Sequence, residues 1–135
     1  MTEPRFRAFL RASLELVGRE TPRLSRALAD HLGADALDVE VDGDRMSVTA
    51  RGPTLAIDAQ HGAAKVHIRT TTPAVRALLA GRTSVIDAVL ADEIELIGAA
   101  EDIARFDRAL FLYLNATVRS PGHPGLMQRY LSSVE

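Results

Sequence analysis

The feature that most constrains the fold of this chain is a change of hydrophobic period at Leu37. From Leu37 to Val41, and again from Arg45 to Arg51, apolar and polar residues alternate. A period of two places the apolar side chains of an extended segment on one face and the polar ones on the other. The pattern predicts strands of an antiparallel sheet that buries one face and exposes the other to water.

Two registers of the first hairpin preserve these faces. A turn at Gly43-Asp44 pairs Val41 with Met46, and the neighbouring register turns at Asp42-Gly43. Both are two-residue turns that contain glycine, so the sequence leaves the register open. Two more strands are expected beyond Gly52-Pro53, on either side of a turn at residues 60–62, and their inward residues are Leu55, Ile57 and Ala59, then Val66 and Ile68.

The flanking segments have helical periodicity. Two helices are expected over residues 2–19 and 21–33, a third from Thr72 to the stop at Gly81, a fourth opened by Thr83, and a long one over residues 99–115. A fifth strand with Ile94 and Leu96 inward separates the last two, and residues 120–125 are expected to form a loop before a short apolar turn. Helices beside one apolar sheet face predict an α+β domain, with a five-stranded, mainly antiparallel sheet and helices packed on one face.

Composition excludes several classes of function. The 135 residues are 47% hydrophobic and 25% charged, which is typical of one globular domain. The net charge of −2 gives no electrostatic reason to expect nucleic acid, and the absence of cysteine excludes disulfides and thiolate sites. No apolar run approaches the roughly 20 residues of a membrane span, and the N-terminus lacks a secretory signal, so we expect the cytoplasm.

No group of polar residues forms a recognisable catalytic or metal-binding pattern. The four histidines lack the spacing of zinc sites, and we expect them at the surface. The acidic series from Asp35 to Asp44 alternates as a solvated strand face does and lacks the spacing of a calcium loop. Asp87 and Asp107 show no partner that would make either one a general acid or base. We therefore expect a protein that is not an enzyme and holds no metal or cofactor.

What remains is a dense set of aliphatic residues, above all in the stretch 78–98. Its most specific parts are Leu78–Ser84, Ile86–Leu90 and Ile94–Gly98. With the order of elements, they resemble the sterol carrier protein (non-specific lipid-transfer) family, as a stand-alone member of bacterial type. The resemblance covers residues 36–115, so that residues 1–33 are N-terminal helices and residues 116–135 a C-terminal extension of a single domain.

The resemblance implies an apolar tunnel between sheet and helices that binds a sterol, a fatty acyl chain or a related lipid. The wall residues that it implies are Leu78, Leu79, Ile86, Val89, Leu90, Ile94 and Leu96. Periodicity adds, as neighbours of this wall, Ile57, Val66, Ile68, Phe106, Leu110, Phe111 and Leu114.

Two features depart from the family pattern. The chain has Ala91-Asp92-Glu93 where the family often has Gly-Lys, which removes a charged contact for a headgroup. The segment after Asn115 is longer than the minimal domain requires. It is expected to plug or cover the tunnel with Leu126, Met127, Tyr130 and Leu131, or to pack on a second subunit in a homodimer.

Three functions follow as alternatives. The first is non-catalytic binding or carriage of an apolar small molecule, without nucleic acid and without stable membrane insertion. The second is an interaction or accessory module with a filled core, and the third is an enzyme of lipid or polyketide metabolism with a buried polar residue. A cavity of roughly 300 Å³ or more separates the first from the second.

Overall fold

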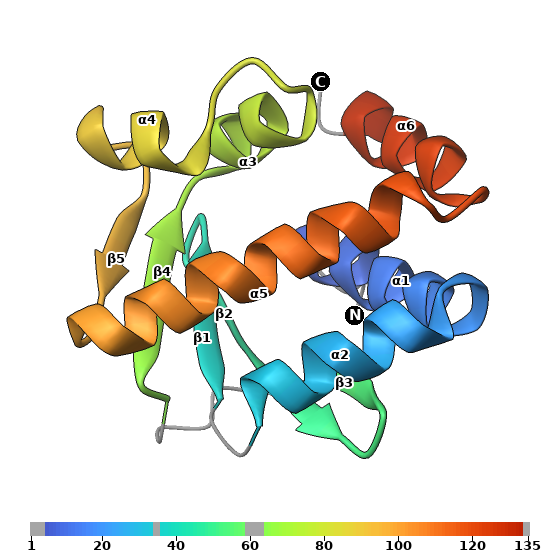
Figure 1. Cartoon of the computed structure of the whole chain (residues 1–135). Coiled ribbons are helices and arrows are strands. Elements are labelled where there is room, and N and C mark those ends of the chain that lie inside the picture. The colour runs from blue at the N-terminus through green and yellow to red at the C-terminus, as the bar shows by residue number, and fades with distance from the viewer. Residues whose placement is uncertain (1–4, 34–35, 59–63, 134–135) are drawn as a thin grey trace.

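The structure is a computed structural model that describes residues 5–33, 36–58 and 64–133. Three predicted features lie outside the described residues: the start of the first helix at residues 2–4, Asp35, and the segment with Ala59 and the turn at residues 60–62. The elements follow one another along the chain (Figure 1) as α1 (Arg5–Glu20), α2 (Pro22–Leu32), β1 (Leu37–Val41), β2 (Asp44–Arg51), β3 (Thr54–Asp58), β4 (Val66–Thr70), α3 (Thr72–Leu79), α4 (Val85–Leu90), β5 (Glu95–Ile97), α5 (Ala100–Val118) and α6 (His123–Ser133).

The five strands form one sheet in the order β3-β2-β1-β4-β5. β1 pairs with β4 in parallel, and the other three pairs are antiparallel. The predicted fold class is confirmed: the domain is α+β, and its sheet is mainly antiparallel. The parallel pair places Val39 opposite Ile68, so that the apolar faces of β1 and β4 coincide.

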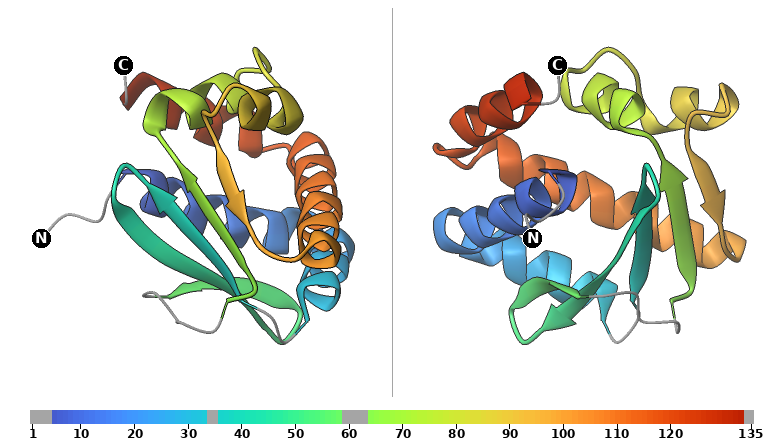
Figure 2. Two further views of the ribbon diagram at one scale, coloured as in Figure 1. Left: turned by 90° about the vertical axis from the view of Figure 1, so that its left-hand side faces the viewer. Right: turned by 180° about the vertical axis from the view of Figure 1, so that it is seen from behind.

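The helices cover one face of this sheet (Figure 2). α1, α2 and α5 lie over it, and α3 and α4 lie beyond one end of the strands. On the covered face, Leu14 of α1 packs with Met46, Val48 and Ile57 of β2 and β3 in a buried cluster. The inward residues of the alternating strands therefore form the floor of the core.

The first hairpin has the second of the two registers that the sequence allowed. Val41 is paired with Asp44, and Asp42 and Gly43 form the turn. Both turn residues have positive φ, 51° and 84°, as type I′ turns require. This turn follows the right-handed twist of the strands, and it places Val39 opposite Met46 on the covered face.

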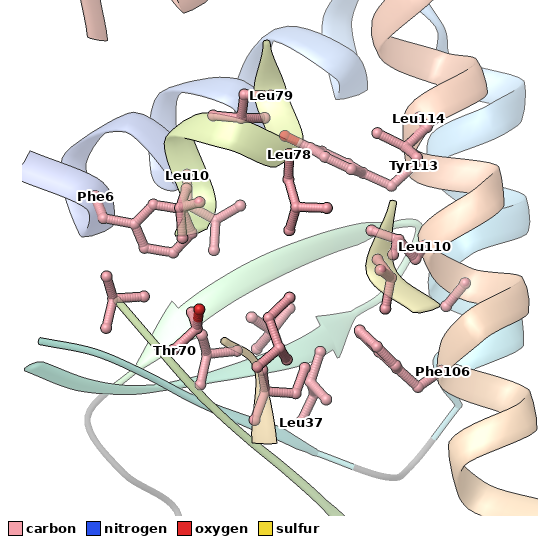
Figure 3. Close-up of a pocket in the computed structure, with 18 of the residues that line it drawn as sticks. Phe6, Leu10, Leu37, Thr70, Leu78, Leu79, Phe106, Leu110, Tyr113 and Leu114 are labelled. Atoms are coloured by element: carbon pink, nitrogen blue, oxygen red, sulfur yellow. The ribbon is translucent and has the colours of Figure 1, made fainter. Parts of the chain in front are cut away.

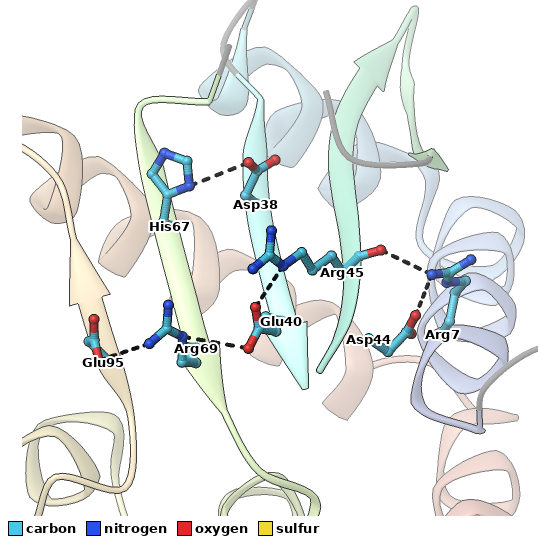
Figure 4. A network of polar contacts seen from close by, with 8 residues as sticks. All are labelled: Arg7, Asp38, Glu40, Asp44, Arg45, His67, Arg69 and Glu95. Carbon is cyan, nitrogen blue, oxygen red and sulfur yellow. Dashed lines mark hydrogen bonds and ion pairs between the residues drawn. The ribbon is translucent and has the colours of Figure 1, made fainter. Parts of the chain in front are cut away.

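The opposite face of the sheet carries a ladder of charged side chains (Figure 4). The Glu40 carboxylate bridges Arg45 at 2.9 Å and Arg69 at 3.5 Å, and Arg69 also pairs with Glu95. One position corrects the prediction of a solvated face. Asp38 is buried, where it accepts a hydrogen bond from the Ser47 hydroxyl and lies 3.3 Å from the His67 ring.

The C-terminal segment differs most from the sequence prediction. A helix, α6, replaces the second half of the predicted loop and the predicted turn, while residues 120–122 are outside any helix. It begins at His123 with Pro124 in its first turn, where proline costs no hydrogen bond. Tyr130 of α6 stacks on Phe9 of α1 with ring centroids 4.6 Å apart. The extension therefore packs on its own first helix.

Three smaller corrections concern helix ends and a histidine. α4 is capped by Ser84 rather than Thr83, because the Ser84 hydroxyl accepts the Asp87 amide at 3.1 Å. α5 continues to Val118, three residues beyond the predicted end at 115. His123, expected at the surface, is 1% exposed, because α6 turns its first residue toward α1 and α5.

Candidate functional site

An apolar pocket of about 380 Å³ lies between the sheet and the helices (Figure 3). It follows from the geometry of the two layers. α5 crosses the sheet at the β4–β5 end, whereas α1 and α2 cover the β2–β3 end. The side chains that project from both layers leave a space between them.

The sheet supplies the floor of the pocket. Alternate residues of its strands point inward because side chains in a strand change face at each residue. From β1 to β5, the lining residues of the strands are Leu37, Val39, Val41, Val48, Leu55, Ile68, Thr70 and Leu96.

The helices supply the walls and the roof. Side chains that recur at helical spacing on each helix face the same space. They are Phe6, Phe9, Leu10 and Leu14 of α1, Leu28 and Leu32 of α2, Val75, Leu78 and Leu79 of α3, and Phe106, Ala109, Leu110, Tyr113 and Leu114 of α5. The remaining lining residues, which belong to the connections and the start of α4, are Thr83, Ser84, Val85 and Ile94.

Few polar side chains reach the pocket. Among the described residues that line it, these are Thr70, Thr83, Ser84 and Tyr113, and the lining contains no carboxylate, imidazole or basic group. The Thr70 hydroxyl donates to the Glu93 carbonyl at 3.0 Å, and Ser84 caps α4. The lining therefore offers an apolar ligand extensive contact and offers an anion no charged partner.

The mouth of the pocket lies between α5 and the start of α4. Two lining residues are exposed there, Ser84 and Leu114, and Leu114 is 46% accessible to solvent. The same two helices carry the exposed apolar side chains Ile86, Leu90, Phe111 and Val118. A ligand that enters beside Leu114 thus meets apolar surface before it reaches the interior.

Eight of the fourteen residues predicted from the sequence line this pocket. They come from β4, β5, α3, α5 and the residue before β5, and they are Ile68, Leu78, Leu79, Ile94, Leu96, Phe106, Leu110 and Leu114. Their placement is what the alternation in the strands and the stripe on α5 predict. Contact with a ligand remains a prediction for each of them.

The other six residues do not line the pocket. Ile57 is buried in the cluster with Met46, and Val66 lines a smaller hollow of about 30 Å³. Val89 of α4 does not line the pocket. The side chains of Ile86 and Leu90 on α4 and of Phe111 on α5 are exposed to solvent. Only one face of each helix can contact the core, and the apolar residues of these two helices extend beyond that face.

The contribution of α1 and α2 was missed at the sequence level. Six lining residues belong to these helices, from Phe6 to Leu32, and none of them is among the residues predicted to line the tunnel. Their spacing showed that they face a core. Nothing in the spacing showed that the same core contains the pocket, since this depends on where α1 and α2 cross the sheet.

A buried polar cluster lies at the α1 side of the pocket. The Ser13 hydroxyl lies 2.6 Å from the Tyr113 hydroxyl and 2.7 Å from Nε2 of His123. Ser13 and His123 are 0% and 1% exposed. Figure 3 shows the Tyr113 side chain extending away from α5 across the space between the helices, and its hydroxyl meets Ser13 of α1.

Burial shifts the acid–base behaviour of this cluster. Removal from water raises the pKa of Tyr113 to about 12, although the hydrogen bond with Ser13 opposes the shift. Burial also lowers the pKa of His123, and the nearby Glu20 carboxylate opposes that change. At neutral pH the phenol is therefore protonated and the imidazole is uncharged.

The described part of the chain contains neither a cluster of metal-binding side chains nor a membrane-spanning helix. Within residues 5–33, 36–58 and 64–133, no group of three or more acidic or histidine side chains is placed to hold a metal ion. No helix in these ranges has the length and hydropathy needed to cross a membrane.

Comparison by sequence identifies no relative. No protein-family model matches the chain. No curated protein matches it either.

Comparison by structure identifies the fold. A protein described as "UbiJ-SCP2 Ubiquinone synthesis protein" superposes with a TM-score of 0.64 at 17% identity, over 86% of this chain and 94% of the other. A possible sterol carrier protein from Thermus thermophilus gives a TM-score of 0.55 at 15% identity, over 86% and 88% of the two chains. Apo sterol carrier protein 2 from Yarrowia lipolytica gives 0.52 at 10% identity, over 80% and 88%. The chain therefore has the sterol carrier protein fold, and the predicted resemblance is confirmed at the level of the fold.

The same fold also occurs inside a larger protein. A stereoselective inverting sec-alkylsulfatase from Pseudomonas sp. superposes with a TM-score of 0.55 at 16% identity. The match covers 72% of this chain and only 15% of the sulfatase chain. The fold thus forms a whole chain in some proteins and a small part of an enzyme in another.

Proposed function

We propose that this protein binds or carries an apolar, lipid-like small molecule in the pocket beneath α5. The observation that supports the proposal is the pocket itself, about 380 Å³ in volume and lined almost entirely by aliphatic and aromatic side chains. This volume lies in the range of small-molecule sites. The sterol carrier proteins with the same fold agree with such a ligand.

The free energy of binding needs no charged contact. Burial of each CH₂ group contributes about 0.8 kcal/mol, and micromolar affinity requires about 8 kcal/mol. About ten buried methylene groups therefore account for micromolar affinity. We propose that the protein acts as a carrier in the cytoplasm and has no catalytic activity.

The proposal is tested by native mass spectrometry of the gently purified protein and by displacement of Nile red from protein freed of lipid. We expect a co-purified apolar molecule, and displacement of the dye by alkyl compounds. The proposal fails if no small molecule co-purifies with the protein and no alkyl compound displaces Nile red or binds to the lipid-free protein.

A matched pair of variants tests the location of the site. Leu110→Trp places an indole in the pocket and should weaken binding by more than about tenfold, because it displaces several ligand methylene groups. Phe111→Trp makes a similar change at the neighbouring residue, which is 65% exposed and outside the pocket, and should leave affinity unchanged. Equal loss in both variants, with both folded, would contradict the proposed site.

An interaction module is the second candidate. Exposed apolar side chains on α4 and α5 support it, since Ile86, Leu90 and Val118 are 68%, 78% and 85% accessible. The filled core that this alternative assumed has no support, because the pocket is open. If the Leu110→Trp variant, whose pocket is filled, still binds a protein partner, the protein acts as an interaction module and not as a carrier.

A further inference from the structure

The cluster of Ser13, Tyr113 and His123 has a property that packing alone does not require. Three helices, α1, α5 and α6, each contribute one of its polar groups, and the apolar ring of Phe9 packs edge-on against His123 at 6.0 Å. Tyr113 also lines the pocket. The cluster therefore connects a buried polar chain to a lining that is mostly apolar and whose other polar side chains are Thr70, Thr83 and Ser84 among the described residues.

The hydrogens of this chain can be arranged in two ways. The Ser13 hydroxyl has one hydrogen and two partners, so it donates to one and accepts from the other. When Ser13 donates to His123, Tyr113 donates to Ser13, and a lone pair of the phenol oxygen stays available. When His123 donates to Ser13, Ser13 donates to Tyr113, and the phenol hydrogen has no partner within the cluster.

Both arrangements are accessible because an uncharged imidazole has two tautomers. Nε2 carries the hydrogen in one tautomer and a lone pair in the other. Tyr113 can thus offer the pocket either an acceptor or a donor, while every other member of the cluster keeps its hydrogen bond. The cluster is already hydrogen-bonded internally, and a ligand oxygen that bonds Tyr113 adds one further hydrogen bond to it.

We propose that the ligand carries one uncharged oxygen group, a hydroxyl or a carbonyl, and that Tyr113 is the residue that hydrogen-bonds it. This inference rests on the proposed function of the pocket. A carboxylate is excluded from the same place because none of the described lining residues carries a positive charge, and an unpaired buried anion is strongly disfavoured. The cluster thus selects alcohols, ketones and esters over fatty acid anions.

The test uses the full chain freed of lipid and four probes of matched length: dodecane, dodecanol, methyl decyl ketone and dodecanoate. Affinities come from displacement of Nile red. We expect dodecanol and the ketone to bind roughly 2- to 10-fold more tightly than dodecane, the net gain of one hydrogen bond to Tyr113. Dodecanoate should bind more weakly than dodecanol.

Two tyrosine variants separate the hydroxyl from the ring. Tyr113→Phe should abolish the preference for the alcohol and the ketone over dodecane. Tyr130→Phe is the control, because Tyr130 is a buried tyrosine that does not line the pocket, and it should retain the preference. The infrared carbonyl band of the bound ketone gives a measurement that needs no variant, and hydrogen bonding should shift it to lower frequency in the unmodified protein.

The outcomes distinguish this inference from the function on which it rests. If all four probes bind equally and Tyr113→Phe changes nothing, the pocket binds alkyl chains and the role of Tyr113 is wrong. Tighter binding of dodecanoate than of dodecanol would also overturn the inference. If no probe binds, the proposed function fails and the inference fails with it.

Discussion

At the scale of single residues, Gly98 shows how closely the strand after α4 approaches its neighbour. A Cβ atom at this position would lie 2.8 Å from the carbonyl oxygen of Lys65. Side chains do not tolerate that distance, and the obstacle is backbone, which cannot rotate away. Glycine is therefore required where β5 turns into α5.

Gly98→Ala should accordingly destabilise the protein by about 1–3 kcal/mol, as overpacked sites do. The measurement is urea denaturation followed by circular dichroism. Gly125→Ala is the control, since its Cβ meets only the Arg129 side chain at 3.7 Å and alanine favours a helix. The control should gain about 0.5–1 kcal/mol, and an equal loss in both variants would contradict the explanation.

Glu20 is a second residue whose contacts predict a measurable effect. Its carboxylate accepts hydrogen bonds from the Ser120 hydroxyl at 2.7 Å and from the Gly122 amide at 2.9 Å. These bonds, the Ser120 bond most of all, lower the pKa of Glu20 below its ordinary value of 4.5. They attach the α5–α6 connection to the end of α1.

The stabilisation from Glu20 should be present above pH 4.5, where the carboxylate is ionised in both folded and unfolded chains. It should be lost as the pH falls through the lower pKa of the folded state, because protonation then weakens both hydrogen bonds. Unfolding followed from neutral to acidic pH measures this dependence. Glu20→Gln should be less stable at pH 7 and should lose stability less steeply in acid, whereas an unchanged acid profile would contradict this role.

At the scale of elements, the packing of α6 on α1 explains how the C-terminal extension is held. Tyr130 stacks on Phe9 at 4.6 Å and meets Phe6 edge-on at 6.2 Å. The Tyr130 hydroxyl, by contrast, is buried and has no hydrogen-bond partner among the described residues. The ring therefore stabilises the contact, and the hydroxyl does not.

Substitutions at Tyr130 should separate these two parts. Tyr130→Ala removes the ring and should cost about 3–5 kcal/mol, the range for large aromatic residues in a core. Tyr130→Phe keeps the ring and removes an unpaired polar atom, so its stability should be equal to or higher than that of the unmodified protein. Thermal or urea unfolding measures both, and a large loss in Tyr130→Phe would contradict the assignment.

Two helix ends that depend on local residues were predicted correctly from the sequence, whereas a helix that depends on a distant contact was not. Caps and breaks are local: Gly33 and Gly81 have positive φ where the helices were expected to stop. α6 was missed because Pro124 and Gly125 are typical of loops. The helix is stabilised by its contact with α1, and the residues of the segment itself do not predict that contact.

At the scale of the whole molecule, the pocket couples binding to stability. A ligand that binds only the folded state raises the free energy of unfolding, by about 2.7 kcal/mol at about 100 times its Kd. Dodecanol should therefore raise the melting temperature of the lipid-free protein in a concentration-dependent way. The Leu110→Trp variant should show a clearly smaller shift at the same dodecanol concentration, and an identical shift in both proteins would place the ligand outside the pocket.

The sequence by itself determined the faces of the elements. Alternation and helical spacing state which side of a strand or helix is apolar, because those directions depend only on the backbone of the same segment. Hence the strands, the α+β class and the lining positions of β4 and α5 followed from residues such as Ile68 and Leu110. Only the tertiary structure decided what each apolar face meets. It paired β1 with β4, turned Phe111 and Leu90 to solvent, buried His123 beside Ser13, and left space beneath α5 instead of filling it, since each of these depends on how distant segments pack.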